Sequence, residues 1–536
     1  MSKTLKELWL RIDRRSEKFR VLSFLLLFAL ILRIPSFFEP YWYGDEAIYL
    51  TIGNALNQGK VLYRDIVDHK TPIIYYLAKV GSQLNFRLLL TGWMLVSYGL
   101  YYAVVSRLLK HRVLAYAATL VFIIFTTTPL LEGLIPNGEL FVLGFVLASL
   151  YVLSKTQVWR KFFSAEQAVQ ANTKPNNAKL LFISGSLMGA AILTKVPAIF
   201  DAAAVGLIGW FAVFNKTKWA SISQPKFYQT LFRQLITTLL SYRWWLAGLL
   251  ISLLLSVIYF VIKGAGSEYL QYGLLYNFHY TGTWIPEVSS WFASIWLPLV
   301  GKFLFAAIFI VGLTLTKNNL TPLTRWSAAW SMLALVAVTL SNRPYPHYLI
   351  QLVLPASILI FSVIASLTSH SLNSTKKTWQ LLIFAVLLII FLLINQLLNF
   401  WGYETLTYYQ NFYRFATGKI ASATYFNQFN ALVKDNLQAA SIIEQSGEKE
   451  VYIWGTNPML YAQTQTSPPD QFIVLFHVLD LKRLDQSLAN IIKAEPPFIV
   501  VMKDAETPPE SFKRFVYQKY KPRFKSEYLS VWQLKK

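Results

Sequence analysis

An apolar run, VLSFLLLFALILRI at residues 21–34, is followed within ten residues by the charged and aromatic stretch YWYGDEAIY at residues 41–49. A second charged stretch, DIVDHKTP, follows at residues 65–72. Charged side chains are costly beside a bilayer, so in a mostly apolar chain such stretches are where chemistry is expected. The combination of a membrane-spanning run and a charged loop therefore predicts both the fold class and the place of the functional site.

The composition is that of a polytopic membrane protein. Of 536 residues, 55% are hydrophobic and 14% are charged, whereas a soluble chain carries about 25% charged residues. The absence of cysteine excludes disulfides, thiolate metal sites and cysteine nucleophiles. Most of the net charge of +23 lies before residue 401, in short loops between apolar runs. This pattern is typical of membrane topology, so no nucleic-acid partner is expected.

The apolar runs predict about eleven transmembrane helices, each of which needs about 20 residues. The first is interpreted as a retained helix, because no small-residue cleavage site follows it. The amphipathic run Phe227–Leu240 is expected to lie at the membrane interface. The predicted spans are 18–37, 87–107, 112–131, 138–154, 179–195, 197–215, 245–262, 291–316, 325–341, 348–368 and 379–400.

The distribution of charge predicts the orientation. Lys and Arg gather at the N-terminus and in alternate loops, at residues 107–112, 155–179, 216–243, 317–325 and 376–377, which places these segments in the cytoplasm. Most acidic residues before position 401 fall in or beside the opposite loops. The catalytic loops, including the first outer loop at 38–86, and the C-terminal region are therefore predicted on the extracytoplasmic side of the cell membrane.

The C-terminal region, residues 401–536, predicts a small α/β domain that follows a transmembrane catalytic domain at residues 1–400. Residues 408–421 are interpreted as a polar, aromatic connector. Helical patterns lie at 428–445, 481–493 and 510–517, and extended patterns lie at 450–454, 497–502 and 527–534. About 130 residues suffice for one hydrophobic core.

Asp45 and Glu46 are the first candidates for catalysis. A helix that starts here has Asp45 at its N-terminus, where the helix dipole keeps the carboxylate ionised. Tyr49, four residues on, shares the face of Asp45 and is a candidate contact for the acceptor or sugar. An ionised carboxylate at the membrane surface suits a general base for an acceptor hydroxyl. The alternative is a simple helix N-cap.

Lys70 is the candidate for binding phosphate. It precedes Pro72, which fits the first turn of an interfacial helix. A cation at this level can stabilise the phosphate leaving group of a lipid-linked substrate. The alternative is a lysine that extends to lipid head groups.

These residues resemble a known family. The order aromatic-x-Asp-Glu-x-x-Tyr at 43–49, followed by Lys-x-Pro at 70–72, is similar to the GT-C membrane glycosyltransferases. It is closest to the protein O-mannosyltransferase and aminoarabinose-transferase branch (the family 39/83 group). The segments EGLIPNGE at 132–139, LTKVPAIFD at 193–201 and RPYPHY at 343–348 also resemble that group.

The resemblance implies that Asp45 acts as the base and that Lys70 contacts the lipid phosphate. The chain departs from the aminoarabinose transferases, which have Arg at the position of Ile48 and Glu at the position of His69. It also lacks room for the β-trefoil insertion of the protein mannosyltransferases. The acceptor, whether protein, lipid or glycan, therefore stays open.

The three later segments supply further candidates. Glu139 is a second candidate for catalysis or an acidic helix cap, and Asn137 is a sugar contact or a cap. Glu132 is a candidate sugar or acceptor contact. Lys195 either binds phosphate or pairs with Asp201 across a broken helix. The remaining candidates for phosphate binding are Arg343, whose guanidinium suits bidentate contact, and His347, which alternatively caps a helix.

No metal and no other cofactor are expected, because the six histidines show no ligand spacing with carboxylates in the sequence. No glycine-rich phosphate loop supports a nucleotide-sugar donor. The predicted function is transfer of a sugar from a polyprenyl-phosphate carrier to an acceptor hydroxyl, with inversion. The alternatives are a polytopic transporter or flippase, and a non-catalytic binder of lipid-linked glycan.

Overall fold

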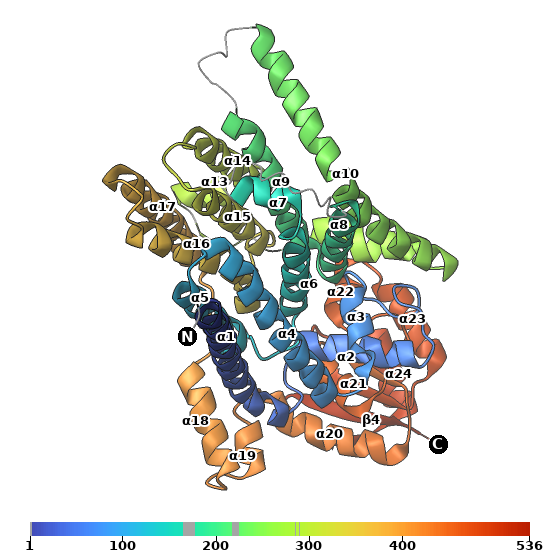
Figure 1. Cartoon of the computed structure of the whole chain (residues 1–536). Coiled ribbons are helices and arrows are strands. Elements are labelled where there is room, and N and C mark those ends of the chain that lie inside the picture. Colours follow the sequence, from blue (N-terminus) through green and yellow to red (C-terminus); the bar gives the residue numbers. More distant parts are fainter. Residues whose placement is uncertain are drawn as a thin grey trace.

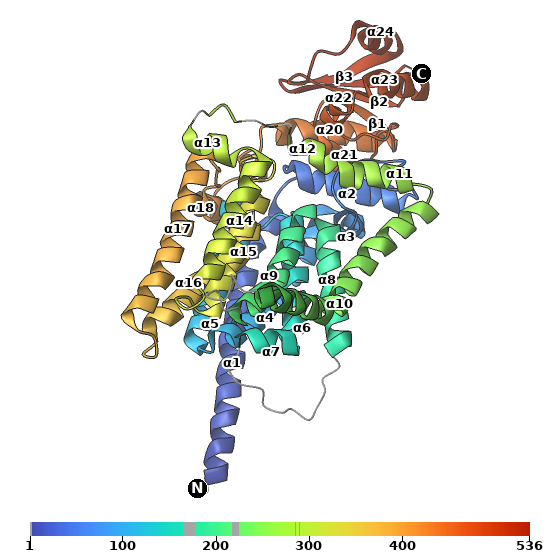
Figure 2. The same ribbon diagram turned by 90° about the horizontal axis from the view of Figure 1, so that it is seen from above.

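The computed structural model describes residues 3–163, 177–216, 225–282, 284, 286–288 and 290–535. The segments at 164–176 and 217–224, which carry Lys174 and Lys218 of the predicted cytoplasmic loops, lie outside the described residues. The helices form an elongated bundle with the N-terminus at one end and a small C-terminal sheet at the other (Figure 2).

Each of the eleven predicted apolar runs forms a helix. They are α1 (Lys3–Arg33), α4 (Gln83–Leu109), α5 (Arg112–Thr127), α6 (Gly138–Leu153), α8 (Asn177–Thr194), α9 (Ile199–Lys216), α10 (Pro225–Ile262), α14 (Leu299–Leu315), α15 (Pro322–Val338), α16 (Ile350–Thr368) and α17 (Ser374–Leu398).

The number of membrane spans stays a prediction. Among the described residues, seven helices are long and apolar enough to cross a membrane, or eight if α6 and the sharply bent α7 (Gln157–Phe163) form one span. Helices α5 and α14 are apolar but shorter. The predicted interfacial run Phe227–Leu240 is continuous with the span of α10, whose 38 residues extend for about 57 Å.

The segment between α1 and α4, here called the first loop, is compact. It contains η1 (Ile34–Phe38), α2 (Gly44–Asn57), α3 (Ile73–Leu77) and η2 (Ala78–Val80). Helix α2 starts at the predicted place, because Tyr43 is extended and acidic side chains occupy its first turn. Gly53 allows α2 to lie against η2, since a Cβ atom at Gly53 would be 2.4 Å from the carbonyl oxygen of Ala78.

Short helices connect the long ones at the end of the bundle that carries the first loop. Helix η3 (Pro129–Leu131) precedes α6, η4 (Val196–Ala198) precedes α9, and η7 (Pro346–Leu349) precedes α16. Between α10 and α14 the chain forms α11 (Gly266–Glu268), the π-helix η6 (Tyr269–Leu275), α12 (Tyr276–Tyr280) and α13 (Trp291–Trp296).

The C-terminal region contains a four-stranded sheet in the order β1-β2-β4-β3, with β1 and β2 parallel and the other pairs antiparallel. The predicted helices and strands are confirmed as α20 (Leu432–Ser446), β1 (Val451–Trp454), α23 (Leu484–Ala494), β2 (Phe498–Met502), α24 (Glu510–Lys519) and β4 (Leu529–Leu534). The sequence prediction lacked α19 (Ser422–Phe426), α21 (Pro458–Thr464), α22 (Leu475–Asp480) and β3 (Tyr520–Lys525), and the predicted connector is largely helix α18 (Thr405–Ala416).

The C-terminal region packs on the first loop, where α2 lies beside α21 (Figure 1). The backbone N–H of Val67 donates to the carbonyl oxygen of Gln471 at 2.8 Å. The Lys60 ammonium donates to the Ser467 hydroxyl at 3.0 Å. Residues that are 400 positions apart in the sequence are thus fixed beside each other.

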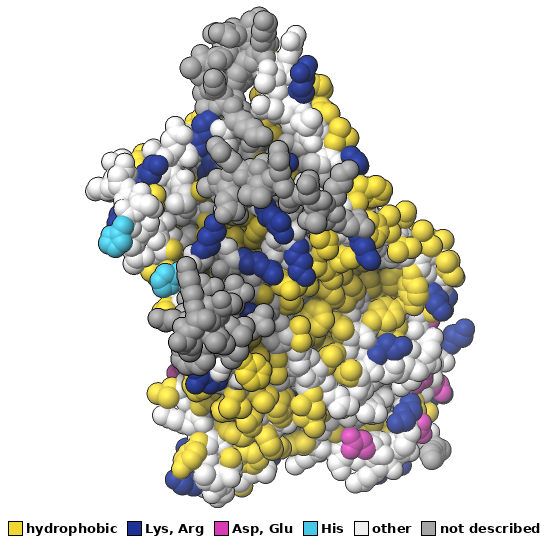
Figure 3. Space-filling view, viewed as in Figure 1, with side chains coloured by type: hydrophobic (Ala, Val, Ile, Leu, Met, Phe, Trp, Pro, Cys, Tyr) yellow, Lys and Arg dark blue, Asp and Glu magenta, His cyan; other side chains and the backbone are white. Residues whose placement is uncertain are grey.

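One face of the molecule shows how charge and apolar surface are separated. A broad hydrophobic area covers the helical bundle, and most of the acidic side chains visible on this face lie over the C-terminal region (Figure 3). Such an apolar surface on a helical bundle is suited to contact with lipid.

Candidate active site

The centre of the site is an ion pair between α2 and the segment that precedes α3. The Lys70 ammonium lies 3.4 Å from one carboxylate oxygen of Asp45 and 3.5 Å from the other. Tyr49, one turn along α2, donates its hydroxyl to Asp45 at 3.2 Å, and its ring lies 5.1 Å from the Lys70 ammonium. The Asp45 side chain is 28% exposed, so this carboxylate can be reached from outside.

Asp68 holds Lys70 from the other side. Its Oδ2 lies 3.6 Å from the Lys70 ammonium and accepts a hydrogen bond from the Tyr75 hydroxyl at 2.6 Å. Lys70 therefore lies between two carboxylates, and only 10% of its side chain is exposed. The Lys70 side chain therefore does not extend to lipid head groups, which was the alternative considered above.

The electrostatics of the pair keep both groups charged. Burial by itself would raise the pKa of Asp45, but Lys70, His347 and Lys195 together outweigh it, so the pKa of Asp45 is below its ordinary value. Burial would likewise lower the pKa of Lys70, but Asp45 and Asp68 raise it above its ordinary value. At neutral pH the pair is a carboxylate beside an ammonium.

Glu139 and Lys195 form a second ion pair next to the first. Glu139 lies in the first turn of α6, and Lys195 lies at the break between α8 and η4. The Lys195 ammonium contacts Glu139 and lies 4.6 Å from the centre of the Tyr348 ring. Lys195 does not pair with Asp201, which instead accepts hydrogen bonds from Trp330 and Gln351.

Glu132 organises a third group. Its carboxylate accepts a hydrogen bond from the Tyr43 hydroxyl and lies 2.6 Å from Nδ1 of His347. The Asn137 side chain donates to Glu132 at 3.3 Å and makes no capping bond, although Asn137 precedes α6. Tyr43 is two residues before Asp45, so this buried group borders the central ion pair.

Arg343 approaches the cluster through aromatic rings. Its guanidinium lies 4.4 Å from the ring centre of Tyr280 and 5.5 Å from that of Trp284. The Tyr280 ring stacks on His69 at 4.6 Å, one residue from Lys70. Burial raises the pKa of Tyr280, against the opposing effect of Arg343, so its hydroxyl stays protonated at neutral pH.

Glu46 is not brought together with these groups. Both of its carboxylate oxygens accept hydrogen bonds from Arg87, at 2.7 and 2.8 Å, and Arg87 also pairs with Glu39 at 2.8 Å. Gln83 donates to Glu46 at 3.2 Å. Glu46 is 2% exposed, so its carboxylate is fully occupied inside the protein.

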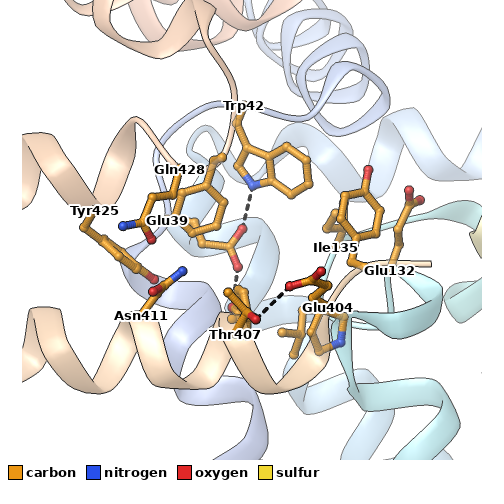
Figure 4. Close-up of a pocket in the computed structure, with 14 residues that line it drawn as sticks. Glu39, Trp42, Glu132, Ile135, Glu404, Thr407, Asn411, Tyr425 and Gln428 are labelled. Carbon is orange, nitrogen blue, oxygen red and sulfur yellow. Dashed lines mark hydrogen bonds between the residues drawn. The ribbon is translucent and has the colours of Figure 1, made fainter. Parts of the chain in front are cut away.

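A pocket of about 200 Å³ lies beside the Glu132 group (Figure 4). Trp42 closes one side and donates to Glu39 at 2.6 Å, and Thr407 donates to Glu404 at 2.8 Å on the opposite side. Aromatic and aliphatic side chains, carboxylates and amides line its wall. The lining residues are Glu39, Trp42, Pro129, Glu132, Leu134, Ile135, Tyr403, Glu404, Thr407, Tyr408, Asn411, Tyr425, Gln428 and Phe429.

Several of these residues carry no signal in the sequence. Tyr280 and His477 reach the cluster only through the fold, and Asp68 was one of several unassigned charges in the first loop. Sequence spacing also gives no sign that ligand atoms of Asp68, His69 and His477 lie within 4.8 Å of one another. His477 is 408 residues from His69, so sequence spacing could not show this group.

No protein-family model and no curated protein sequence matches this chain. In structure the chain is similar to ArnT from Cupriavidus metallidurans in the apo state, with a TM-score of 0.52 and 15% identity over 95% of this chain and 97% of ArnT. A more distant neighbour is the oligosaccharyltransferase AglB from Archaeoglobus fulgidus, solved with an inhibitory peptide and a dolichol-phosphate. Its TM-score is 0.40, with 13% identity over 91% of this chain and 70% of AglB. The likeness to ArnT extends over nearly the whole chain, and at least seven of the described helices are long and apolar enough to cross a membrane, so the chain is a multi-pass membrane protein with the GT-C fold.

Proposed function

We propose that the protein is a membrane glycosyltransferase that moves a sugar from a polyprenyl-phosphate carrier to an acceptor hydroxyl. The observation that carries this proposal is the ion pair of Asp45 and Lys70, which offers a reachable carboxylate and an ammonium 3.4 Å apart. The GT-C fold and the resemblance of residues 43–49 and 70–72 to that family support the same assignment.

The pair provides the two functions that the reaction needs. The ammonium of Lys70 binds the phosphate of the donor, and the carboxylate of Asp45 accepts the proton of the acceptor hydroxyl. When phosphate binds to Lys70, it competes with Asp45 for the ammonium. The Asp45 carboxylate then loses its strongest partner and becomes more basic at the moment when a base is required.

The bond changes follow from this geometry. The acceptor oxygen attacks the anomeric carbon, the bond between that carbon and the phosphate oxygen breaks, and the proton moves from the acceptor to Asp45. The lipid phosphate leaves with the bonding electron pair, and Lys70 stabilises its negative charge. A single displacement of this kind inverts the anomeric centre.

The remaining candidate residues have supporting roles in the proposal. Lys195, held by Glu139, and Arg343, held against Tyr280, add positive charge for the phosphate. Tyr49 orients the Asp45 carboxylate. His347 positions Glu132 through their contact of 2.6 Å, and Asn137 does the same from α6. Glu46 fixes the start of α2 through Arg87 and takes no part in the chemistry.

The pocket beside Glu132 is proposed to bind the acceptor. Aromatic rings stack on the apolar faces of sugars, while carboxylates and amides bind their hydroxyl groups. The wall of this pocket combines both kinds of side chain, which favours a glycan or a glycosylated lipid as acceptor.

The proposed topology places the N-terminus in the cytoplasm and the ion pair outside. The basic ends of α4, α5 and α7 lie at the same end of the bundle as the N-terminus, and the first loop lies at the opposite end (Figure 2). This arrangement agrees with the positive-inside rule. We further propose residues 1–400 as the catalytic membrane domain and residues 401–536 as an extracytoplasmic domain.

The test is transfer from a labelled polyprenyl-phosphate sugar in membranes that contain the full chain. We expect incorporation of label with wild type and its loss with Asp45→Asn. Binding of the donor without any transfer by wild type would support a non-catalytic binder. Movement of the intact donor from one leaflet of a vesicle membrane to the other would instead support a flippase.

A further inference from the structure

We propose that Asp68, His69 and His477 bind a zinc ion that joins the first loop to helix α22 of the C-terminal region. This inference does not depend on the glycosyltransferase proposal, because it rests on the arrangement of the three side chains themselves.

The distances among the three ligand atoms are those of a metal site. Nδ1 of His69 lies 3.1 Å from Oδ1 of Asp68 and 3.2 Å from Nε2 of His477, and the third side of this triangle is 3.4 Å. In a tetrahedral zinc site with bonds of about 2.0–2.1 Å, neighbouring ligand atoms are about 3.3 Å apart. The triangle therefore has the dimensions of one face of such a tetrahedron.

The burial of these groups also favours an ion at Oδ1 of Asp68, because Lys70 and Tyr75 contact the other oxygen, Oδ2. Asp68 is 1% exposed and His477 is 2% exposed. Oδ1 of Asp68 receives no hydrogen bond from any described residue, although two ring nitrogens lie within 3.4 Å of it. A buried carboxylate oxygen without a donor is costly. A metal ion at the centre of the three atoms would remove that cost.

The donor set indicates zinc. Two imidazole nitrogens and one carboxylate oxygen are ligands that zinc prefers, and three protein ligands leave a fourth position for water. A small cavity beside the group, lined by His69, Tyr276 and His477 among others, has about the volume of one water molecule.

Neighbouring residues hold the ligands in place. The second oxygen of Asp68 accepts the Tyr75 hydroxyl at 2.6 Å, so Oδ1 stays directed at the histidines. The His69 ring stacks on Tyr280 at an angle of 28°, and its backbone oxygen accepts a hydrogen bond from Asn277 at 3.0 Å. Such partners orient metal ligands in known sites.

The proposed ion has a consequence for Lys70. Asp68 lies two residues before Lys70 and contacts its ammonium, while His477 belongs to the C-terminal region. A zinc ion would therefore fix the position of Lys70 by attaching the first loop to α22. In this role the ion is structural, and its loss would loosen the contact between the two regions.

The test measures zinc in the full chain, purified in detergent with a tag that contains no histidine. After incubation with zinc chloride and removal of unbound metal, mass spectrometry should find about one zinc ion per wild-type chain. His69→Ala and His477→Ala should each reduce this content by about tenfold or more. His279→Ala, which removes an exposed histidine of the neighbouring α12, is the matched control and should keep the ion.

A second measurement covers the case in which the variants fail to fold. Wild-type protein incubated with Co²⁺ should show the intense visible absorption of tetrahedral cobalt, and added zinc should abolish it. The proposal is overturned if wild type binds neither metal. It is also overturned if zinc content is unchanged in both His69→Ala and His477→Ala, because the ion would then lie elsewhere.

Discussion

Asp45 and Glu46 are adjacent carboxylates in the same first turn of α2, yet their surroundings are opposite. Glu46 is buried and receives two hydrogen bonds of 2.7 and 2.8 Å from Arg87. Asp45 is partly exposed, and its one ion pair among the described residues is with Lys70 at 3.4 Å. The oxygens of Glu46 accept hydrogen bonds inside the protein, whereas those of Asp45 can still accept a hydrogen bond from an incoming group.

This difference separates a carboxylate that is held in the structure from the one that we propose as the base. A bidentate pair with arginine is short and directional, and its loss leaves buried charge without a partner. In a longer pair, the lysine ammonium exchanges its carboxylate partner for another anion more easily, since it has three donors that rotate freely. Proximity in sequence therefore says little about shared function, and the partner decides the role.

Asp45→Asn should produce the largest change in activity. Removal of a general base lowers the rate by about 10²–10⁴-fold. The variant keeps the shape of the side chain, so the melting temperature in detergent should stay close to that of wild type. Transfer from a polyprenyl-phosphate sugar is the measurement, and a rate within threefold of wild type would exclude Asp45 as the base.

Glu46→Gln should show the reverse pattern. It leaves Arg87 buried with Glu39 as its remaining charged partner, and breaking a buried pair costs about 3 kcal/mol in unfolding free energy. Thermal unfolding in detergent measures this loss. The activity per folded molecule should fall much less than in Asp45→Asn. A stable Glu46→Gln protein with strongly reduced turnover would contradict the structural role.

Gly53→Ala tests how closely α2 must lie against η2. The new Cβ atom would be 2.4 Å from the carbonyl oxygen of Ala78, so α2 must move, at a cost of about 1–3 kcal/mol. Because α2 carries Asp45, the transfer rate should fall as well. Gly92→Ala in α4 is the control, since no atom lies within 4 Å of its added Cβ. Equal stability of the two variants would contradict the close contact.

Trp42→Phe should have the smallest effect and should affect acceptor binding alone. Phenylalanine keeps an aromatic wall but removes the indole N–H that donates to Glu39 at 2.6 Å. Because this bond is made within the protein and only positions the pocket wall, its loss should raise the acceptor KM by about threefold to tenfold. The KM for the donor should be unchanged. A selective effect on the donor KM would move the donor into this pocket.

The sequence predicts the helices well, because a membrane span requires a long apolar run, and each of the eleven apolar runs forms a helix. It also predicts the start of α2, since Asp45 and Glu46 favour the positive end of a helix dipole. Both the apolar runs and the start of α2 depend on residues that are close together in the sequence. The elements missed in the C-terminal region, α21, α22 and β3, are short and have weak periodicity.

The sequence cannot predict which carboxylate meets which cation. The pairing of Glu46 with Arg87 depends on the packing of α2 against α4, and the pairing of Lys195 with Glu139 depends on the break between α8 and η4. His477 approaches His69 only because the C-terminal region folds back on the first loop. Contacts of this kind are set by tertiary structure and leave no local pattern.

The backbone bond between Val67 and Gln471 also has a consequence for the order of events during synthesis. The membrane helices and the first loop emerge from the ribosome long before residue 471 does. Until then, the segment that carries Lys70 lacks the contacts that the C-terminal region supplies, such as the bond from Val67 to Gln471. The chain therefore enters the membrane with an incomplete site, and the proposed donor site is completed only when synthesis is nearly finished.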